Sequence, residues 1–532
     1  MRFSFGSILR LGRAGFVLAR AGVFSDVDPS ILPPAARLPL GLAKLLARRG
    51  SGTGGAKGAG KTASGLANLP GAISRLGPSY VKLGQFLATR PDVVGAAVVK
   101  QLERLQDRME PFPRAVAIAT IEAAFGEPIG RIFVSFGEPV AAASIAQVHR
   151  ARVNYAEGER DVAVKVLRPG VERLFRRDLG DMYFAARLAE RWIDDARRLK
   201  LGGVVDTLAR TVKMEMDFRL EAAAASEFAE NVSKDSDLRI PHIDWDRTAK
   251  EVLTLEWIDG TPLSDVKALA AKGYDLQDLG RNVVQSFLRT AMRDGLFHAD
   301  MHQGNLFVDT EGRLTAVDFG IMGRLGFKER RFLAEILYGF IKRDYRRVAE
   351  VHFEAGYVPR VHKVEDFAQA IRAIGEPIHA RTADQISMAK LLTLLFEITG
   401  LFDMKTRIEL VLLQKTMVVV EGVARTLDPK LNVWSTSEPV VGAWIEQNLG
   451  PAGKLQDASR AAMTLGRFAS NLPAVLVRGE NIINQIEGMA ENGFELSDSV
   501  IQKIGEAEAR GARLGHIALW LIAAIGLLML LR

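Results

Sequence analysis

The chain has 532 residues, with 70 Lys and Arg against 63 Asp and Glu, a net charge of +7 and no cysteine. The lack of cysteine excludes disulfides and thiolate metal sites, and a hydrophobic content of 48% argues against a wholly disordered chain. The basic excess suits an anionic partner, whether a nucleic acid, a nucleotide or an acidic membrane surface.

Residues 1–62 are predicted to form a basic amphipathic helix followed by a flexible linker. Between residues 2 and 20 arginines are mixed with apolar side chains, whereas a secretory signal would show an unbroken apolar run. Such a helix could lie on anionic lipid or pack on the protein's own surface. The Gly-rich stretch 50–61 runs into GAKGAGKT at 55–62, a formal match to a phosphate-binding loop. No strand is visible before it, so we interpret the stretch as linker.

The central part of the chain is predicted to be an α+β unit with two lobes and a cleft between them. Residues 63–130 show helical spacing of apolar side chains and are expected to form a helical extension. Residues 131–258 are expected to form a small β-rich lobe with inserted helices, and 259–430 a larger helical lobe with two short strands. Residues 431–512 are expected to form a further helical region. The strand candidates are 132–136, 145–153, 162–167, 251–257, 306–308 and 314–317.

Residues 513–532 are predicted to contain a C-terminal transmembrane helix. The segment from 514 to 531 reads LGHIALWLIAAIGLLMLL and has no Asp, Glu, Lys or Arg. As a helix it would span roughly 27 Å, close to the thickness of a bilayer core. Arg510 and Arg513 precede it and Arg532 follows it, which weakly favours the cytoplasmic side for the rest of the chain.

The densest group of candidate catalytic residues reads HADMHQGN, from His298 to Asn305, and is followed by Asp318-Phe-Gly. An Asp, an Asn five residues later and a second Asp after the next hairpin is the arrangement used for phosphoryl transfer. Mg²⁺ prefers carboxylate and amide oxygens, which Asn305 and Asp318 can supply, while Asp300 can orient a nucleophile. Taken singly, the aspartates could be turn residues and His298 a core histidine. A metal site of His298 and His302 is a further alternative that needs a continuous helix.

A second candidate is Lys165, in the apolar strand Val-Ala-Val-Lys. A lysine there is costly to bury unless it is paired. Kinase-like folds pair it with the phosphates of ATP and with a glutamate on a helix, and Glu221 is the best candidate for that partner. The alternative is an edge-strand lysine whose ammonium group reaches solvent. Lys165, Glu221, Asp300, Asn305 and Asp318 follow one another in the order found in kinases.

The glycine-rich loop G-x-G-x-x-G is missing from residues 131–164, the segment directly before Lys165. Ala141, Ala142, Ala143 and Ser144 stand in its place. Alanine methyl groups restrict the backbone and its approach to phosphate more than glycine does. We therefore expect a stiffer loop or a nucleotide that sits differently from that of a typical kinase.

These motifs resemble those of the UbiB family of atypical kinases. The family's K-x-G-Q signature reads Lys82-Leu-Gly-Gln85, its E-x-D motif reads Glu215-Met-Asp217, and its HADxHxGN motif reads HADMHQGN. The resemblance runs from about residue 70 to 430. Resemblance to the bacterial ubiquinone-biosynthesis branch rests on the segment VLLQKTMVVVEGVARTLDP and on the hydrophobic tail.

The resemblance implies a two-lobed protein-kinase-like fold with ATP and Mg²⁺ as cofactors. It implies that Lys82 and Gln85 lie over the active site, where a protein substrate would dock, and that Glu215 and Asp217 hold them there. Asp300, Lys165 and Glu221 would be catalytic, and Asn305 and Asp318 would bind the metal. The nucleotide-binding residues it implies are Ala141, Ala142, Ala143, Ser144, Val148, Lys165, Glu256 and Ile258.

The function implied is that of a membrane-bound ATPase or atypical kinase that supports ubiquinone biosynthesis by handling lipophilic polyprenyl-phenol intermediates. Membrane lipid, pathway intermediates and pathway enzymes would be its partners, a homodimer is allowed, and no nucleic acid is expected. Its place would be the cell inner membrane, with the catalytic domain facing the cytoplasm. Two other functions stay open: a protein or small-molecule kinase, and a nucleotide-binding scaffold.

Overall fold

The computed structural model describes residues 5–21, 23, 67–88, 90–102, 104–105, 109–192, 197, 199–379, 398, 401–404 and 408–450. The chain divides into two compact units, Met1–Ile445 and Glu446–Arg532, and the packing described below belongs to the first. The GAKGAGKT segment and the predicted transmembrane tail lie outside the described residues. Among the helices of the described ranges, none combines the length and apolarity that a membrane crossing needs.

Several short helices form the predicted N-terminal extension. Helix α1 packs against α4 and α10, and Arg10 on α1 donates two hydrogen bonds, of 2.6 and 2.8 Å, to the carboxylate of Asp181 on α10. Packing on the protein's own surface is therefore observed for this helix. The extension is broken between α4 and α5, because Gly77 has a φ of 101° and Pro78 begins a new helix. The helices of the extension are α4 (Leu69–Leu76), α5 (Pro78–Leu87), α6 (Pro91–Val94), α7 (Ala96–Leu102) and α8 (Arg114–Phe125). Helix α1 (Phe5–Arg20) precedes them, α9 (Ile129–Ile132) leads into the first sheet, and α10 (Val171–Trp192) follows the third strand of that sheet.

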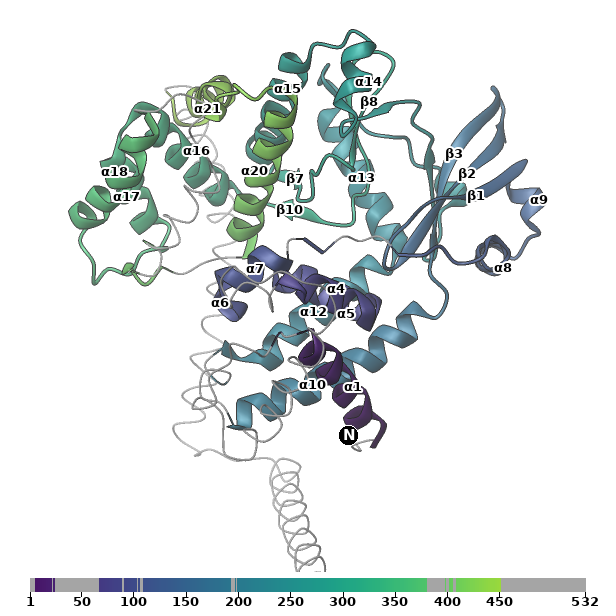
Figure 1. The fold of residues 1–532 in the computed structure, drawn as a ribbon. Helices are drawn as coiled ribbons and strands as arrows, with labels where there is room; N and C mark the ends of the chain where they lie inside the picture. The colour runs from purple at the N-terminus through teal and green to yellow at the C-terminus, as the bar shows by residue number, and fades with distance from the viewer. Residues whose placement is uncertain are drawn as a thin grey trace, which may run out of the picture. The chain divides into compact units, whose positions relative to one another are not determined.

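A four-stranded antiparallel sheet in the order β1-β2-β3-β5 follows (Figure 1). Its strands are β1 (Ser135–Ala142), β2 (Ala146–Tyr155), β3 (Gly158–Leu167) and β5 (Val252–Glu256). Alternate residues of β3, among them Val164 and Val166, share one core with residues of α8. Leu167 and Leu253 belong instead to the main core, with α10, α12 (Leu201–Glu215) and α13 (Phe218–Val232).

The predicted boundaries of the first strand were wrong. Ile132 ends the short helix α9, so β1 begins only at Ser135 and then continues through Ala141 and Ala142. The alanine segment is therefore half strand, and the turn that joins β1 to β2 is only the three residues from Ala143 to Ile145.

The second half of the described chain is mainly helical. The strands predicted at 306–308 and 314–317 are found as β8 (Leu306–Val308) and β9 (Leu314–Ala316). Four further strands of two or three residues were not predicted. They are β4 (Leu238–Arg239), β6 (Thr261–Pro262), β7 (Leu296–His298) and β10 (Met322–Arg324), arranged in the sheet β4-β9-β8-β6 and the pair β10-β7.

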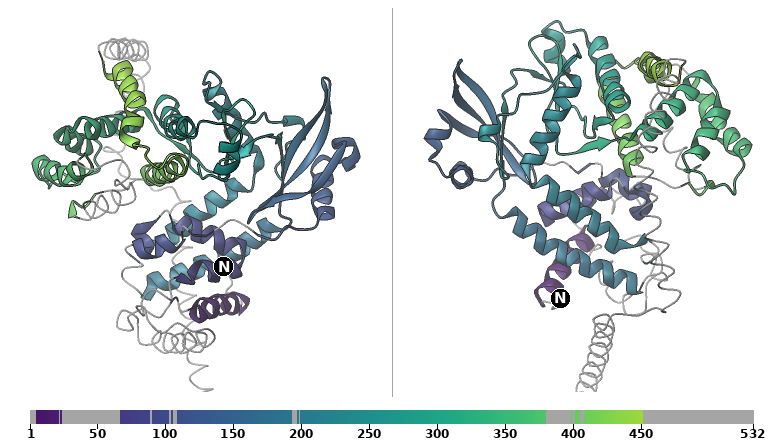
Figure 2. Two further views of the ribbon diagram at one scale, coloured as in Figure 1. Left: turned by 45° about the horizontal axis from the view of Figure 1, so that its top comes forward. Right: turned by 180° about the vertical axis from the view of Figure 1, so that it is seen from behind.

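Helix α20 (Ile408–Leu427) runs beside α15 (Leu276–Arg289) in Figure 1 and in the views of Figure 2. Helix α15 continues through a π-helical turn, Thr290–Asp294, into β7. A further core joins α16 (Phe327–Lys342), α17 (Tyr345–Glu354) and α18 (Val364–His379). The remaining helices are α14 (Val266–Ala271), the 3-10 helix Trp245–Arg247 and α21 (Val433–Leu449).

Candidate active site

Lys165 is the centre of a buried charge cluster. Since side chains alternate along β3, Lys165 points to the face opposite Val164 and Val166. Its ammonium nitrogen lies 2.8 and 3.0 Å from the two carboxylate oxygens of Glu221 on α13, and 3.0 Å from Oδ1 of Asp318. The predicted Lys165–Glu221 pair is therefore observed. The edge-strand alternative is wrong, because β3 lies between β2 and β5.

The opposite charges of Lys165 and Asp318 each stabilise the charged form of the other. Burial alone would lower the pKa of Lys165, but the carboxylates of Asp318 and Glu221 outweigh it and raise that pKa above its usual value. The positive charge of Lys165 holds the pKa of Asp318 well below its usual value, and Lys82 acts in the same direction. At neutral pH the lysine is therefore protonated and Asp318 is an anion.

Asp318 and Asn305 offer oxygen atoms that suit Mg²⁺. Asp318 follows β9 in a left-handed conformation, with a φ of 63°, and its side chain is half-exposed. Asn305 uses its amide nitrogen for a 3.1 Å hydrogen bond to the carbonyl of Asp300, so its amide oxygen is the atom left to bind metal. Among the described residues no cluster of three or more Asp, Glu or His side chains could hold a metal alone. Phosphate oxygens and water would have to complete the shell, which is usual for Mg²⁺.

His298 is a buried structural residue, with 1% of its surface exposed. Its Nε2 hydrogen-bonds to the carbonyl of Val317 at 3.1 Å, and its Nδ1 accepts from the backbone N–H of Asp300 at 3.1 Å. Burial lowers its pKa, so the ring is neutral. His298 ends a strand and not a helix, so the alternative of a helical His298–His302 metal site is wrong and the core-histidine interpretation holds.

The K-x-G-Q segment on α5 contacts α12. The ammonium group of Lys82 lies 2.7 Å from the carboxylate of Glu215. A Cβ at Gly84 would lie 2.4 Å from Cδ1 of Leu105, so a larger residue there would force that side chain to move. Gln85 is half-buried.

Asp217 does not hold the extension as expected. It caps α13, where its carboxylate accepts a 3.2 Å hydrogen bond from the backbone N–H of Arg219 and pairs with that residue's guanidinium group. Glu215 thus holds the extension, while Asp217 fixes the start of the helix that carries Glu221.

The alanine turn is fixed by its own backbone and by the segment before α8. The N–H of Ala143 donates to the carbonyl of Ala146 at 2.8 Å, and the carbonyl of Ala142 accepts from Met109 at 3.3 Å. Arg168 donates to the carbonyls of Glu110 and Ala143, at 3.0 and 3.4 Å. The expected stiffness of the loop stays a prediction. Arg168 was not predicted, since a contact to backbone carbonyls carries no sequence signal.

The other predicted nucleotide-binding residues lie near the same strands. Val148 on β2 is opposite Lys165 in the strand register, and Ser144 is buried in the turn. Glu256 ends β5, where its carboxylate pairs with Arg239 and accepts from the backbone N–H of His242. Ile258 follows and is half-buried. Their role in nucleotide binding stays a prediction.

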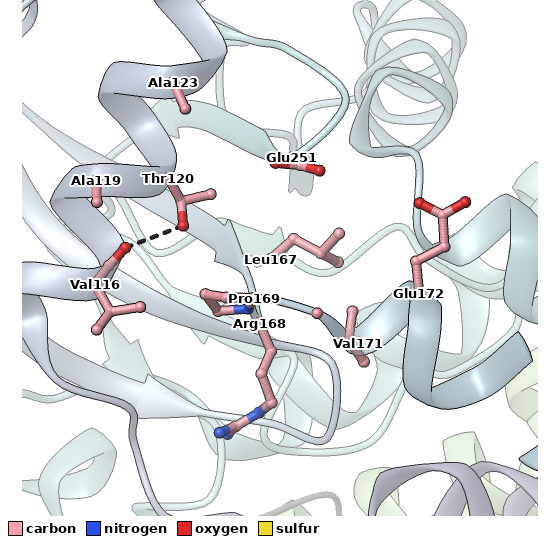
Figure 3. Close-up of a pocket in the computed structure, with 11 residues that line it drawn as sticks. Val116, Ala119, Thr120, Ala123, Leu167, Arg168, Pro169, Val171, Glu172 and Glu251 are labelled. Atoms are coloured by element: carbon pink, nitrogen blue, oxygen red, sulfur yellow. Dashed lines mark hydrogen bonds between the residues drawn. The ribbon is translucent and has the colours of Figure 1, made fainter. Parts of the chain in front are cut away.

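A pocket of about 330 Å³ lies away from this cluster, between α8, the end of β3 and the start of α10 (Figure 3). Figure 3 shows the guanidinium end of Arg168 pointing away from Glu172 and Glu251. None of the predicted phosphate- or metal-binding residues is among its described lining residues, so this pocket is not the predicted nucleotide site. The lining residues are Val116, Ala119, Thr120, Ala123, Leu167, Arg168, Pro169, Gly170, Val171, Glu172 and Glu251.

Comparison with known proteins gives two family matches. The ABC1 atypical kinase-like domain matches residues 104–352, and the UbiB helical domain matches residues 371–432. The kinase-like α+β fold expected from the motifs is thereby confirmed.

Similar curated proteins bear the name "Probable protein kinase UbiB". The one from Marinobacter nauticus is 42% identical over 390 residues, covering 72% of this chain and 71% of its own. Those from Azotobacter vinelandii and Pseudomonas paraeruginosa are 40% and 39% identical, covering 73% and 74% of this chain and 72% and 74% of their own. A solved structure of an erythromycin complex from Mycobacterium tuberculosis covers 68% of this chain and 90% of its own, at 25% identity and a TM-score of 0.47.

Proposed function

This chain belongs to the UbiB family of atypical kinase-like proteins, and from that premise we propose that it is a membrane-bound ATPase supporting ubiquinone biosynthesis. The observation that carries the ATP chemistry is the ammonium group of Lys165, held within 3.0 Å of both Glu221 and Asp318. A buried cation is thus in direct contact with a carboxylate whose oxygen atoms suit Mg²⁺, which supports the charge arrangement that phosphoryl transfer uses.

Each residue would have a separate task. Lys165 would give up its contact with Asp318 and bind phosphate oxygens. Asp318 and Asn305 would hold Mg²⁺, which when bound neutralises the charge that develops on the phosphates. Asp300 would orient the attacking water through its carboxylate. Burial of Glu221 under Lys165 would keep the ammonium group in place while the phosphates change.

Hydrolysis, and not transfer to a protein, is supported by two features. The Lys82–Glu215 pair holds the K-x-G-Q helix on α12, whose next neighbour in the chain carries Glu221. The methyl groups of the alanine turn limit its backbone conformations, so its N–H groups cannot approach the phosphates as those of a glycine-rich loop do. A protein or small-molecule kinase is the second candidate, favoured by the presence of Lys165, Asp300, Asn305 and Asp318 in one constellation.

The membrane part of the proposal rests on the apolar segment 514–531 and on α1. The outward face of α1 exposes Leu9 and Phe16, at 61% and 48%, beside Arg13. We include in the proposal an inner-membrane location facing the cytoplasm, handling of lipophilic pathway intermediates, contacts with pathway enzymes and the option of a homodimer.

Quinone profiling in a strain lacking this protein tests the pathway assignment. We expect ubiquinone to fall and polyprenyl-phenol intermediates to accumulate. Wild-type protein should restore the profile, and Asp318→Asn should not. The matched control is Asp278→Asn, because Asp278 is equally exposed, at 51% against 50%, and is also ion-paired. Normal ubiquinone in the deletion strain would contradict the proposal.

A further inference from the structure

A buried threonine on α20 reaches the catalytic loop. The side chain of Thr416 is fully buried, and its hydroxyl oxygen lies 3.1 Å from the carbonyl oxygen of Ala299 and 2.8 Å from that of Leu412. One hydroxyl proton is shared between these two acceptors. The bond to Leu412 is the usual helical bond to the residue four positions earlier. The bond to Ala299 joins residues 117 positions apart.

The acceptor is the peptide group that leads into Asp300. A peptide group is planar, so the Ala299 carbonyl and the Asp300 N–H turn together. Thr416 binds the carbonyl end of this plane, and Nδ1 of His298 binds the N–H end at 3.1 Å. The orientation of this plane sets the backbone angle of Asp300 and therefore the direction of its carboxylate.

Ala299 is also hydrogen-bonded to the segment that follows Asp318-Phe-Gly. The N–H of Ala299 donates to the carbonyl of Ile321 at 3.0 Å, and the pairing continues as β7 with β10, where His298 is opposite Met322. Helix α20 packs on β10 as well as on α15. Thr416 therefore contacts the loop at the point where the segment that carries Asp300 pairs with the segment that follows Asp318.

Thr416 lies outside the matched kinase-like domain and inside the matched UbiB helical domain, 371–432. The helical domain thus supplies a side chain to the backbone of the catalytic loop. Thr416 belongs to none of the kinase motifs, because it lies in the segment VLLQKTMVVVEGVARTLDP.

We propose that Thr416 is a positioning residue, which holds the Ala299–Asp300 peptide group and so couples the position of α20 to the direction of the Asp300 carboxylate. This inference deepens the proposed ATP hydrolysis and rests on it. Displacing a catalytic group slightly costs rate while leaving nucleotide contacts on Lys165 and Asp318 in place. A movement of α20 would change turnover by the same route.

The test compares three variants of the full chain. Thr416→Val removes the hydroxyl at nearly constant volume, and Thr416→Ser restores it. Thr426→Val is the matched control, because Thr426 is on the same helix and donates to Gly422 four residues earlier, but is exposed. We expect Thr416→Val to lower kcat for ATP hydrolysis about tenfold or more with little change in KM, Thr416→Ser to recover most of kcat, and Thr426→Val to match the wild type.

Equal losses in Thr416→Val and Thr416→Ser, or a wild-type kcat in Thr416→Val, would overturn the proposal. If Thr416→Val does not fold, Thr416→Cys replaces it, because a thiol is a weaker donor than a hydroxyl. Its kcat should then fall below that of Thr416→Ser, and equal values would count against the hydrogen bond.

Hydrogen–deuterium exchange without nucleotide separates this inference from the proposed function. The peptide covering 296–306 should exchange faster in Thr416→Val than in the wild type, and not in Thr426→Val. This readout needs no ATP chemistry, so it still decides whether Thr416 holds the loop if the wild type hydrolyses no ATP. Unchanged exchange in Thr416→Val would refute the positioning role.

Discussion

The ammonium group of Lys82 lies 2.7 Å from the carboxylate of Glu215, and only 12% and 8% of the two side chains are exposed. A buried ion pair is sensitive to the loss of either member, because the remaining charge has lost its partner and has little solvent around it. The pair also joins two parts of the molecule, α5 of the N-terminal extension and the end of α12. The ion pair therefore holds the extension against α12, the helix that precedes the one carrying Glu221.

We predict that Lys82→Ala destabilises the chain by about 3 kcal/mol or more, because it leaves the carboxylate of Glu215 buried and unpaired. The control is Arg281→Ala, whose pair with Asp278 has the same 2.7 Å length but is half-exposed, and which should cost less than about 1 kcal/mol. Urea unfolding followed by far-UV circular dichroism measures both. A similar loss of unfolding free energy in the two variants would show that the Lys82–Glu215 pair does not hold the extension in place.

Asp318→Asn should remove most Mg²⁺-dependent ATP binding. The substitution keeps the size of the side chain but takes away the anionic metal ligand, while Lys165 keeps its partner Glu221. A thermal-shift titration with Mg²⁺-ATP gives the measurement, with Asp278→Asn as the control. A folded Asp318→Asn protein that shifts as far as the wild type would refute the metal assignment.

The pH dependence of stability should identify the charge of Asp318. Lys165 lowers the pKa of Asp318 in the folded chain, so the stabilisation from its ionised form is present above the pKa of the unfolded chain and is lost as pH falls through the folded pKa. The difference in unfolding free energy between wild type and Asp318→Asn should be constant from pH 5 to 7 and shrink in more acidic solution. A difference that instead grows as the solution becomes more acidic would contradict the ion pair with Lys165.

The sequence was sufficient for the charged centre of the site. Lys165 in an alternating strand, followed in order by Glu221, Asp300, Asn305 and Asp318, predicted a pairing that the structure shows at 2.8 Å. This works because a buried charge needs a partner and because the spacing of the motif residues limits which partner is available.

Backbone-directed contacts could not be predicted in the same way. Thr416 and Arg168 bind carbonyl groups, which every residue possesses, so no residue type marks the partner. The left-handed φ of Asp318 and the strand that runs into Ala142 depend on neighbours brought together by the fold. Asp217 was assigned to the extension because it belongs with Glu215 to the family's E-x-D motif, but the structure uses the Asp217 carboxylate to cap the start of α13.

Removing residues 514–532 should move the protein from the membrane fraction to the soluble fraction. The motive is the segment of eighteen residues without a charged side chain, from 514 to 531. Fractionation of cells followed by salt and carbonate extraction gives the measurement, and a tail of the same length with three leucines replaced by lysine is the control. If the shortened chain still resists extraction, the exposed face of α1 with Leu9 and Phe16 becomes the candidate anchor.

The alanine turn should limit what the site does with its nucleotide. Ala142 is the last residue of β1, pairs with Gln147 across the hairpin, and gives its carbonyl to Met109. Glycine at this position would free the backbone of the turn and let its N–H groups approach the phosphates, as glycine-rich loops of typical kinases do.

We therefore expect Ala142→Gly to change Mg²⁺-ATP affinity and to increase the incorporation of labelled phosphate into the protein itself. Ala119→Gly on α8 is the control, because it is exposed and should cost a similar ~1 kcal/mol of stability without touching the turn. Ala141→Gly and Ala143→Gly, measured beside it, locate the effect within the turn. If glycine at each of the three positions leaves both affinity and incorporation at the wild-type level, the turn serves packing alone. The restriction on phosphate transfer would then have to come from the helix that carries Lys82.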